Sequence, residues 1–194
     1  MAKNGILRRG FKSEAERLAE KYRKELGIHP CGALCAFALA EHLSIPVHSA
    51  TDILKEVQYI DLLSGQNGMP NEWSALTMPT AQGHQIIIYN PYHSTARQQS
   101  DIMHEIAHVI CKHTRSQSKY DFEIPMGMHE YDEVQEEEAK CLGSTLQLAK
   151  PCLLWARKRS MTTDEVALHF IASTEMVQYR TNMLGLNSIY NKKA

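Results

Sequence analysis

The sequence predicts an α+β fold that is mostly helical, with a small three-stranded sheet packed on one central helix. Three observations support this prediction. Apolar residues recur at helical spacing along most of the 194 residues. Three short segments have the composition of strands, namely Ile45–Val47, Trp73–Met78 and Gln85–Tyr89. The helix that follows the third segment has an apolar stripe that would hold it against a core.

The first residues are predicted to form two helices and one edge strand. A capping box at residues 13–16 predicts a helix that ends at Gly27. A second helix, from about Cys31 to Leu43, is apolar on nearly all sides, which indicates burial. Pro46 cannot donate a hydrogen bond to a neighbouring strand, so the first strand segment is expected at the edge of the sheet.

The middle of the chain is predicted to form a hairpin and the central helix. Residues 49–63 have a weak helical pattern, and a loop is expected over Gly65–Asn71. The second and third strand segments, joined by a turn with Pro and Gly, are typical of a hairpin. The central helix begins at about Arg97, with Ser100 and Asp101 as candidate N-cap residues. Its apolar stripe consists of Ile102, Met103, Ile106, Val109 and Ile110.

Beyond the central helix, an irregular polar segment is expected over residues 114–130. A helix from about Asp132 to Ala149 follows, and Pro151 opens another over Cys152–Arg159. A capping box at residues 162–165 and a Ser173 cap then predict two short helices, which together resemble a helix-turn-helix.

The charge of this last region bears on DNA binding. Residues 150–194 carry seven Lys and Arg against three acidic residues, a local excess of +4. Packing helices without DNA contact are favoured over DNA binding, because the second short helix carries only Arg180, at an end expected to be exposed.

Composition and charge narrow the class of protein. The chain is 43% hydrophobic and 22% charged, which fits a soluble domain with a full core. A net charge of −1 argues against binding nucleic acid over the whole surface, and no apolar run reaches the length of a membrane span. The basic N-terminus lacks the apolar segment of a secretory signal. Five cysteines without paired spacing favour free thiols and a cytoplasmic location, with Cys31 and Cys35 as buried thiols rather than metal ligands.

The central helix carries the motif H-E-x-x-H at residues 104–108. His104 and His108 are one turn apart on one face, so both imidazoles can reach one tetrahedral ion. Glu105 is then placed to act as general base on a water molecule. The pattern predicts a Zn²⁺ site with His104 and His108 as ligands and Glu105 as the catalytic residue.

A third protein ligand is needed, and it is usually a carboxylate further along the chain. The run Glu136-Glu137-Glu138 lies near the start of a predicted helix about 30 residues later. Spacing alone does not say which of these glutamates faces the metal.

Four segments of the sequence resemble the ImmA/IrrE-type metallopeptidase family. They are Arg8–Ala15, Phe37–Val47, Ile88–Asp101 with the H-E-x-x-H motif, and the helix from Glu136 with its Glu-x-Glu-Ala, Leu142-Gly143 and Leu146. The resemblance covers most of the chain and predicts a zinc metallopeptidase-like domain over residues 1–150, with residues 151–194 as a C-terminal helical extension.

The resemblance also implies roles for individual residues. It assigns the third zinc ligand to Glu136, although Glu133 and Glu137 remain alternatives. The family often has Asn or Asp where this chain has Lys140, at a position able to support a ligand histidine. Family members are typically cytosolic and cleave a helix-turn-helix repressor encoded beside them, so such a repressor is the implied partner.

The first functional hypothesis is therefore a zinc-dependent endopeptidase that cleaves a repressor and switches gene expression. Its oxyanion-stabilising residue is left open among five candidates: His93, His113, Tyr120, His129 and Tyr131. The alternatives are a non-proteolytic transcriptional regulator with structural zinc and a toxin-like partner of a DNA-binding antitoxin. Three His and Glu ligands favour catalysis, since structural zinc sites usually have four ligands rich in Cys.

Overall fold

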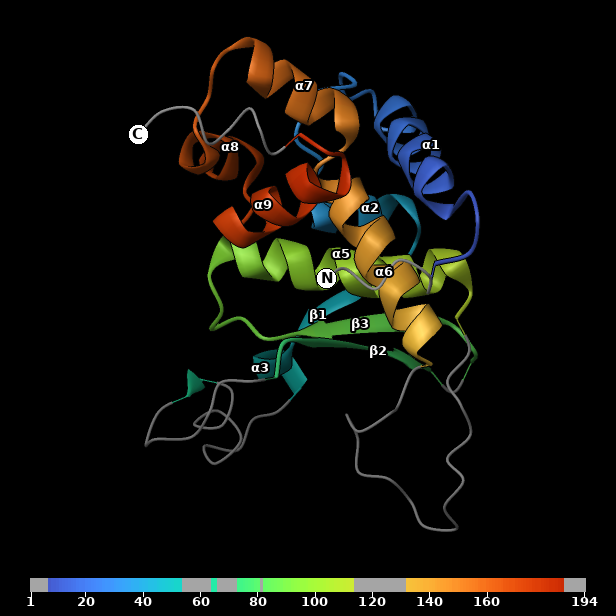
Figure 1. Cartoon of the computed structure of the whole chain (residues 1–194). Coiled ribbons are helices and arrows are strands. Elements are labelled where there is room, and N and C mark those ends of the chain that lie inside the picture. Colours follow the sequence, from blue (N-terminus) through green and yellow to red (C-terminus); the bar gives the residue numbers. More distant parts are fainter. Residues whose placement is uncertain (1–6, 54–63, 66–72, 81, 114–131, 187–194) are drawn as a thin grey trace.

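The computed structural model describes residues 7–53, 64–65, 73–80, 82–113 and 132–186. It confirms the predicted α+β fold, in which helices pack above one face of a three-stranded sheet (Figure 1). The predicted end of the 49–63 helix, most of the 65–71 loop and the 114–130 segment lie outside the described residues.

The sheet has the strand order β1-β3-β2. Strand β2 (Ala75–Pro79) and strand β3 (Gln85–Tyr89) are antiparallel, as the hairpin prediction requires. Strand β1 (Val47–Ser49) pairs in parallel with β3 and is an edge strand. It begins after Pro46 rather than at Ile45, and short helix α3 (Ala50–Ile53) follows it directly.

Helix α1 (Phe11–Glu25) begins earlier than the predicted capping box. The amide of Ser13 already donates to the carbonyl of Gly10, so Ser13 lies inside the helix and does not cap it. The chain enters α1 through Gly10 at φ 86°, a left-handed conformation that glycine adopts readily. This start buries Phe11 in the core, and burial of an aromatic side chain outweighs a surface cap.

Helix α2 (Ala36–His42) is shorter than the predicted 31–43 helix. Its first amide, on Ala36, donates to Oε1 of Gln99 at 2.6 Å. Gln99 comes from the central helix, so a tertiary contact sets where α2 begins. Cys31 is half-buried and Cys35 is exposed, so the expectation of two buried thiols on a helix is wrong.

The central helix, α5 (Thr95–Cys111), begins earlier than predicted. Ser94 is its N-cap and accepts a hydrogen bond from the amide of Arg97. Ser100 and Asp101 therefore lie inside the helix, and their prediction as N-cap residues is wrong. A helix capped by Ser94 is six residues longer before the H-E-x-x-H motif than one capped by Ser100, and it therefore forms more backbone hydrogen bonds.

Helix α6 (Glu133–Gln147) starts at an Asp132 cap close to the predicted position, and α7 (Lys150–Lys158) has Pro151 in its first turn. Helix α8 (Thr163–Phe170) has the predicted Thr162–Glu165 capping box. Helix α9 (Thr174–Met183) has the predicted Ser173 cap and packs against α8.

Arg180 on α9 is not at an exposed end, contrary to the sequence-based expectation. Only 1% of it is exposed, because its guanidinium donates to the carbonyl of Leu148 at 2.8 Å and to Oε1 of Glu16 at 2.7 Å. A buried charge is tolerated only when it is paired and hydrogen-bonded, and these two acceptors meet that requirement. Arg180 is thereby removed from the set of cations that could contact DNA.

The predicted division into a metallopeptidase-like domain over residues 1–150 and a helical extension over residues 151–194 stays a prediction.

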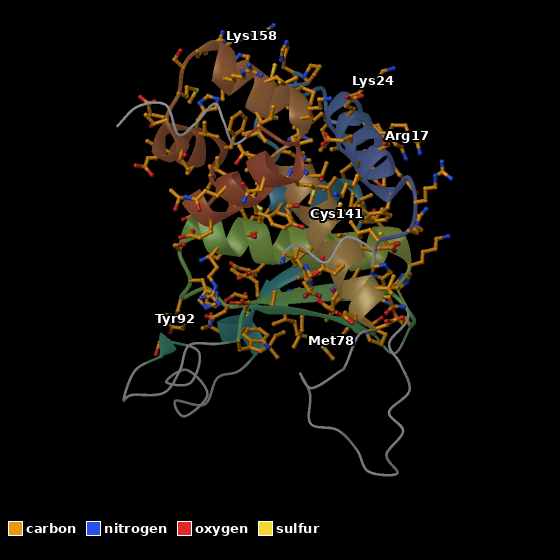
Figure 2. All side chains as sticks on the ribbon, in the orientation of Figure 1. Arg17, Lys24, Met78, Tyr92, Cys141 and Lys158 are labelled. Carbon is orange, nitrogen blue, oxygen red and sulfur yellow. The ribbon has the colours of Figure 1, made fainter. Side chains whose placement is uncertain are left out.

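A second buried arginine ties α1 to α6. Arg23 is fully buried and donates to four carbonyls, those of Ala19, Gly32, Leu146 and Gln147, at 2.9–3.2 Å. Two of these carbonyls belong to the last turn of α6, which has no helical partners for them. Charged side chains such as Arg17, Lys24 and Lys158 instead extend from the outer helices, and Cys141 lies in the interior (Figure 2).

Helices α5 and α6 pack against each other along much of their length, and Gly143 permits a close approach. A Cβ atom at Gly143 would lie 3.0 Å from the carbonyl oxygen of Met103 and 3.1 Å from Cα of His104. The two backbones thus touch directly at the turn of α5 that carries the first histidine of the motif. Around this crossing the core is filled by Ile102, Ile106, Ala139, Leu142 and Leu146.

Gly143→Ala should lower the free energy of unfolding of the metal-free protein by about 1–2 kcal/mol. Overpacking costs roughly 1–3 kcal/mol, and the better helix propensity of alanine returns up to about 1 kcal/mol. Urea unfolding measures the change. Val134→Ala, at an exposed position on the same helix, is the control and should have little effect. A gain in stability for Gly143→Ala would show that the crossing has room for a methyl group.

Candidate metal centre

The two histidines of the motif converge on one point. They lie one turn apart on α5, and their Nε2 atoms are 3.0 Å apart. The side chain of His108 is 3% exposed and that of His104 is 32% exposed. One face of the pair is therefore packed in the protein while the other is accessible from solvent.

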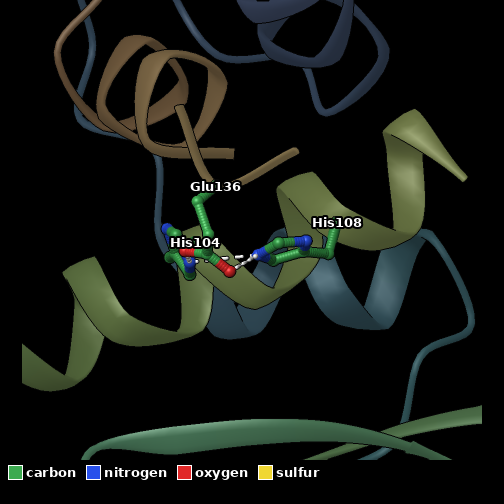
Figure 3. A group of neighbouring side chains, drawn as sticks. All are labelled: His104, His108 and Glu136. Carbon is green, nitrogen blue, oxygen red and sulfur yellow. Dashed lines mark hydrogen bonds and ion pairs between the residues drawn. The ribbon is translucent and has the colours of Figure 1, made fainter. Parts of the chain in front are cut away.

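Glu136 completes the group from the start of α6. Its Oε2 lies 3.3 Å from Nε2 of His104, and its Oε1 lies 3.5 Å from Nε2 of His108 (Figure 3). Within the described residues, His104, His108 and Glu136 form a group that could hold a metal ion, and neither Glu133 nor Glu137 belongs to such a group. The structure thus brings together the three residues that the resemblance implies as ligands.

The separations among these donor atoms fit a small tetrahedral ion. With zinc–nitrogen and zinc–oxygen bonds of about 2.0 Å, two ligand atoms of a tetrahedron lie about 3.3 Å apart. Here the two Nε2 atoms are 3.0 Å apart, and they lie 3.3 and 3.5 Å from the two different oxygens of Glu136. Two imidazoles and a carboxylate are also a ligand set used by catalytic zinc sites. The residues present therefore fit zinc in both spacing and chemistry.

Electrostatics favours a charged Glu136 in this group. Its hydrogen bond with His104 lowers the pKa of the carboxyl group, and the charges of His104 and His108 lower it further against the opposing effect of burial. Burial by itself would lower the pKa of His104, but its hydrogen bond with Glu136 and the charges of Glu105 and Glu136 outweigh it and raise that pKa.

Glu105 lies in a different environment from Glu136. It is 8% exposed, and burial raises the pKa of its carboxyl group against opposing contributions from Thr77 and His104. The hydroxyl of Thr77, on strand β2, donates to Oε2 of Glu105 at 2.6 Å. This bond fixes the carboxylate on the sheet side of α5. The sequence pattern gave no signal for the role of Thr77, because the contact depends on how β2 packs under α5.

A pocket of about 520 Å³ opens beside His104 and Glu105. Strand β2, helix α5 and helix α6 supply most of its wall, and Asp101 and Lys140 add charges of opposite sign. The other lining residues are Trp73, Ser74, Ala75, Ser100, Ala139, Gly143, Ser144 and Met176. The pocket is thus large enough to hold part of a peptide next to the motif.

The five candidates for oxyanion stabilisation divide by position. His93 lies against Asp101, with Nδ1 3.2 Å from Oδ2, and His113 lies against His108. Neither lines the pocket. Tyr120, His129 and Tyr131 lie outside the described residues. Lys140, at the position where the family often has Asn or Asp, lines the pocket and rests 5.0 Å above the ring of Tyr179.

A second group of possible ligands lies behind the first and consists of Cys111, His113 and Glu138. Sequence analysis named His113 only as an oxyanion candidate and left Glu138 within an acidic run. The pair Cys31 and Cys35 belongs to no such group among the described residues.

Comparison with protein families gives one match. The model described as the IrrE N-terminal-like domain, of peptidase family M78, matches residues 56–182. This span contains strands β2 and β3, helices α5 and α6, and the group His104, His108 and Glu136. Neither proteins of curated function nor solved structures give a significant match. Within the described residues, every helix is too short or too polar to cross a membrane.

Thr77→Val should raise the pKa of Glu105 in the metal-free protein. The Thr77 hydroxyl bonds to the charged carboxylate and stabilises it, so its loss favours the protonated form. Nuclear magnetic resonance of the glutamate side-chain carboxyl groups can follow the titration, with Glu105→Gln to assign the signal. Thr95→Val, at an exposed position on α5, is the matched control. An unchanged or lower pKa in Thr77→Val would contradict the assigned hydrogen bond.

Proposed function

The chain belongs to the IrrE N-terminal-like family of peptidases, and we propose that it is a zinc-dependent endopeptidase of the ImmA/IrrE type. The observation that carries this proposal is the convergence of two imidazole nitrogens, 3.0 Å apart, on a carboxylate whose two oxygens lie 3.3 and 3.5 Å from them, beside a buried carboxylate and an open pocket. Each of these parts is needed for hydrolysis of a peptide bond, and here α5 supplies the two histidines and Glu105 while α6 supplies Glu136.

In the proposed site, His104, His108 and Glu136 hold the zinc ion and leave the pocket side for water and substrate. When bound, zinc lowers the pKa of water and polarises the carbonyl group of the substrate. The alternative of a purely structural zinc is less well supported, because such sites are usually closed by four ligands rich in Cys. The three ligands proposed here include no cysteine, and one of them, His104, lines an open pocket.

Glu105 is the proposed general base and acid. It accepts a proton from the attacking water and delivers it to the nitrogen of the leaving amine. Burial raises the pKa of Glu105 toward the range in which a carboxyl group can both take and give a proton, while Glu136 remains charged. The hydrogen bond from Thr77 holds the carboxylate in one orientation during both transfers.

The proposed substrate is a helix-turn-helix transcriptional repressor in the cytoplasm. This part of the proposal rests on the resemblance of the sequence to the ImmA/IrrE family. The pocket beside Glu105 can take part of an extended peptide, so a flexible segment of such a repressor is the expected cleavage site.

Glu136→Ala should weaken zinc binding by more than the roughly 10–100-fold that is typical of changes around a metal ligand. Glu133→Ala is the matched control, since Glu133 begins the same helix but belongs to no ligand group among the described residues. Competition with a chromophoric chelator measures both affinities. If Glu133→Ala loses zinc and Glu136→Ala keeps it, the third ligand is wrongly assigned.

Glu105→Gln should keep one zinc ion per chain and slow peptide cleavage by about 100-fold or more, because general base catalysis typically contributes that much. The assay uses a helix-turn-helix repressor, the proposed class of substrate, and mass spectrometry detects the cut. Glu137→Gln, on α6 and outside the ligand group, is the control. Cleavage by Glu105→Gln at the wild-type rate would exclude Glu105 as the base.

A further inference from the structure

A continuous line of contacts runs from His108 away from the pocket. The Nδ1 atoms of His108 and His113 are 3.0 Å apart, and Nε2 of His113 lies 3.2 Å from Oε2 of Glu138. The other oxygen of Glu138, Oε1, accepts a hydrogen bond from Nε of Arg8 at 3.1 Å. Arg8 also pairs with Glu14 at 2.6 Å. None of these contacts uses the Nε2 atom of His108 that faces Glu136.

One set of protonation states satisfies every member of this line. If Nε2 of His108 binds a metal ion, its proton is on Nδ1, which donates to Nδ1 of His113. The proton of His113 is then on Nε2 and is donated to the carboxylate of Glu138. Arg8 donates to the remaining oxygen and compensates the buried negative charge. In this arrangement each donor meets one acceptor.

Burial separates this line from solvent until it reaches Arg8. The side chains of His108, His113 and Glu138 are 3%, 5% and 11% exposed, whereas that of Arg8 is 54% exposed. Buried polar contacts hold their geometry well, because breaking one leaves a partner without compensation. The line therefore restrains the ring of His108 from the side opposite the pocket.

We propose that His113, Glu138 and Arg8 form a relay that fixes the orientation and tautomer of His108 and strengthens its binding of a divalent ion. Partners of this kind commonly orient metal-binding histidines. This inference rests on the proposed metal ligands but not on peptide cleavage. Lys140, which occupies the position of a supporting Asn or Asp, points instead to Tyr179, so the relay supplies the support from another direction.

The relay extends beyond the family-matched region, because it includes Arg8. The family match begins at residue 56, so Arg8 lies outside it, in the segment just before α1. His113 and Glu138 lie inside the match. The N-terminal segment thus contributes directly to the surroundings of a metal ligand.

The same residues could instead be ligands, since Cys111, His113 and Glu138 also form a possible metal group. Two observations favour the relay. The guanidinium of Arg8 already occupies one oxygen of Glu138 and would repel a second cation. Burial also raises the pKa of the Cys111 thiol to about 12, which disfavours the thiolate that a metal ion requires.

The test measures zinc affinity of the metal-free full chain in competition with a chromophoric chelator. His113→Phe keeps a ring but removes both nitrogens, and should raise the Kd by about 10–100-fold. His113→Gln keeps one acceptor and one donor, and should recover most of this loss. Arg8→Met should raise the Kd by up to about five-fold, as for a partly exposed ion pair, whereas Arg9→Met should leave it unchanged.

Several outcomes would overturn the relay. One is a wild-type Kd in His113→Phe. Another is an equal loss in His113→Gln and His113→Phe, because restoring a donor and an acceptor then recovers nothing. A third is binding of two ions, or a thiolate-to-cobalt absorption band that Cys111→Ser abolishes in the cobalt-substituted protein, because His113 and Glu138 are then ligands. Wild-type protein that binds no zinc overturns both the relay and the proposed function. Zinc binding with the expected variant effects but no peptide cleavage overturns the peptidase proposal alone and supports the relay.

Discussion

The direct contact between the backbones of α5 and α6 is the constraint on which the site depends. Glu136 lies seven residues before Gly143, which is nearly two turns and about 10 Å along α6. A glutamate side chain is short, so its carboxylate meets His104 and His108 only if the two helix axes lie close together. Gly143 allows that approach because it places no Cβ against the backbone of Met103 and His104. Core packing and ligand geometry are therefore set by the same crossing.

The two carboxylates beside the histidines differ because their surroundings differ. Glu136 reaches the histidines from the open side and is 44% exposed, and its hydrogen bond with His104 keeps its pKa low. Glu105 is enclosed between α5 and the sheet, and burial keeps its pKa high. A permanently charged group suits a ligand, and a group that titrates more easily suits proton transfer. The proposed division of roles thus follows from the layer in which each side chain lies.

Periodic and local features could be predicted from the sequence, and contacts between distant segments could not. The H-E-x-x-H spacing, the Thr162–Glu165 capping box and the hairpin are local patterns, and the structure contains all three. The starts of α1 and α2 were misplaced because burial of Phe11 and a cap from Gln99 decide them. Thr77, Glu138 and the two buried arginines each have a partner between 28 and 164 residues away in sequence. No periodicity within one segment encodes such pairs.

The position of Arg23 has a consequence for how this protein can be divided. It holds the final carbonyls of α6 from a helix that precedes the family-matched region by some thirty residues. An excised fragment confined to residues 56–182 would leave those carbonyls without a donor and would uncover the apolar side of α6 that α1 now shields. The catalytic signature of the family and the ancillary N-terminal helix accordingly form one folding unit, and expression of the recognised portion by itself is expected to yield an unstable polypeptide.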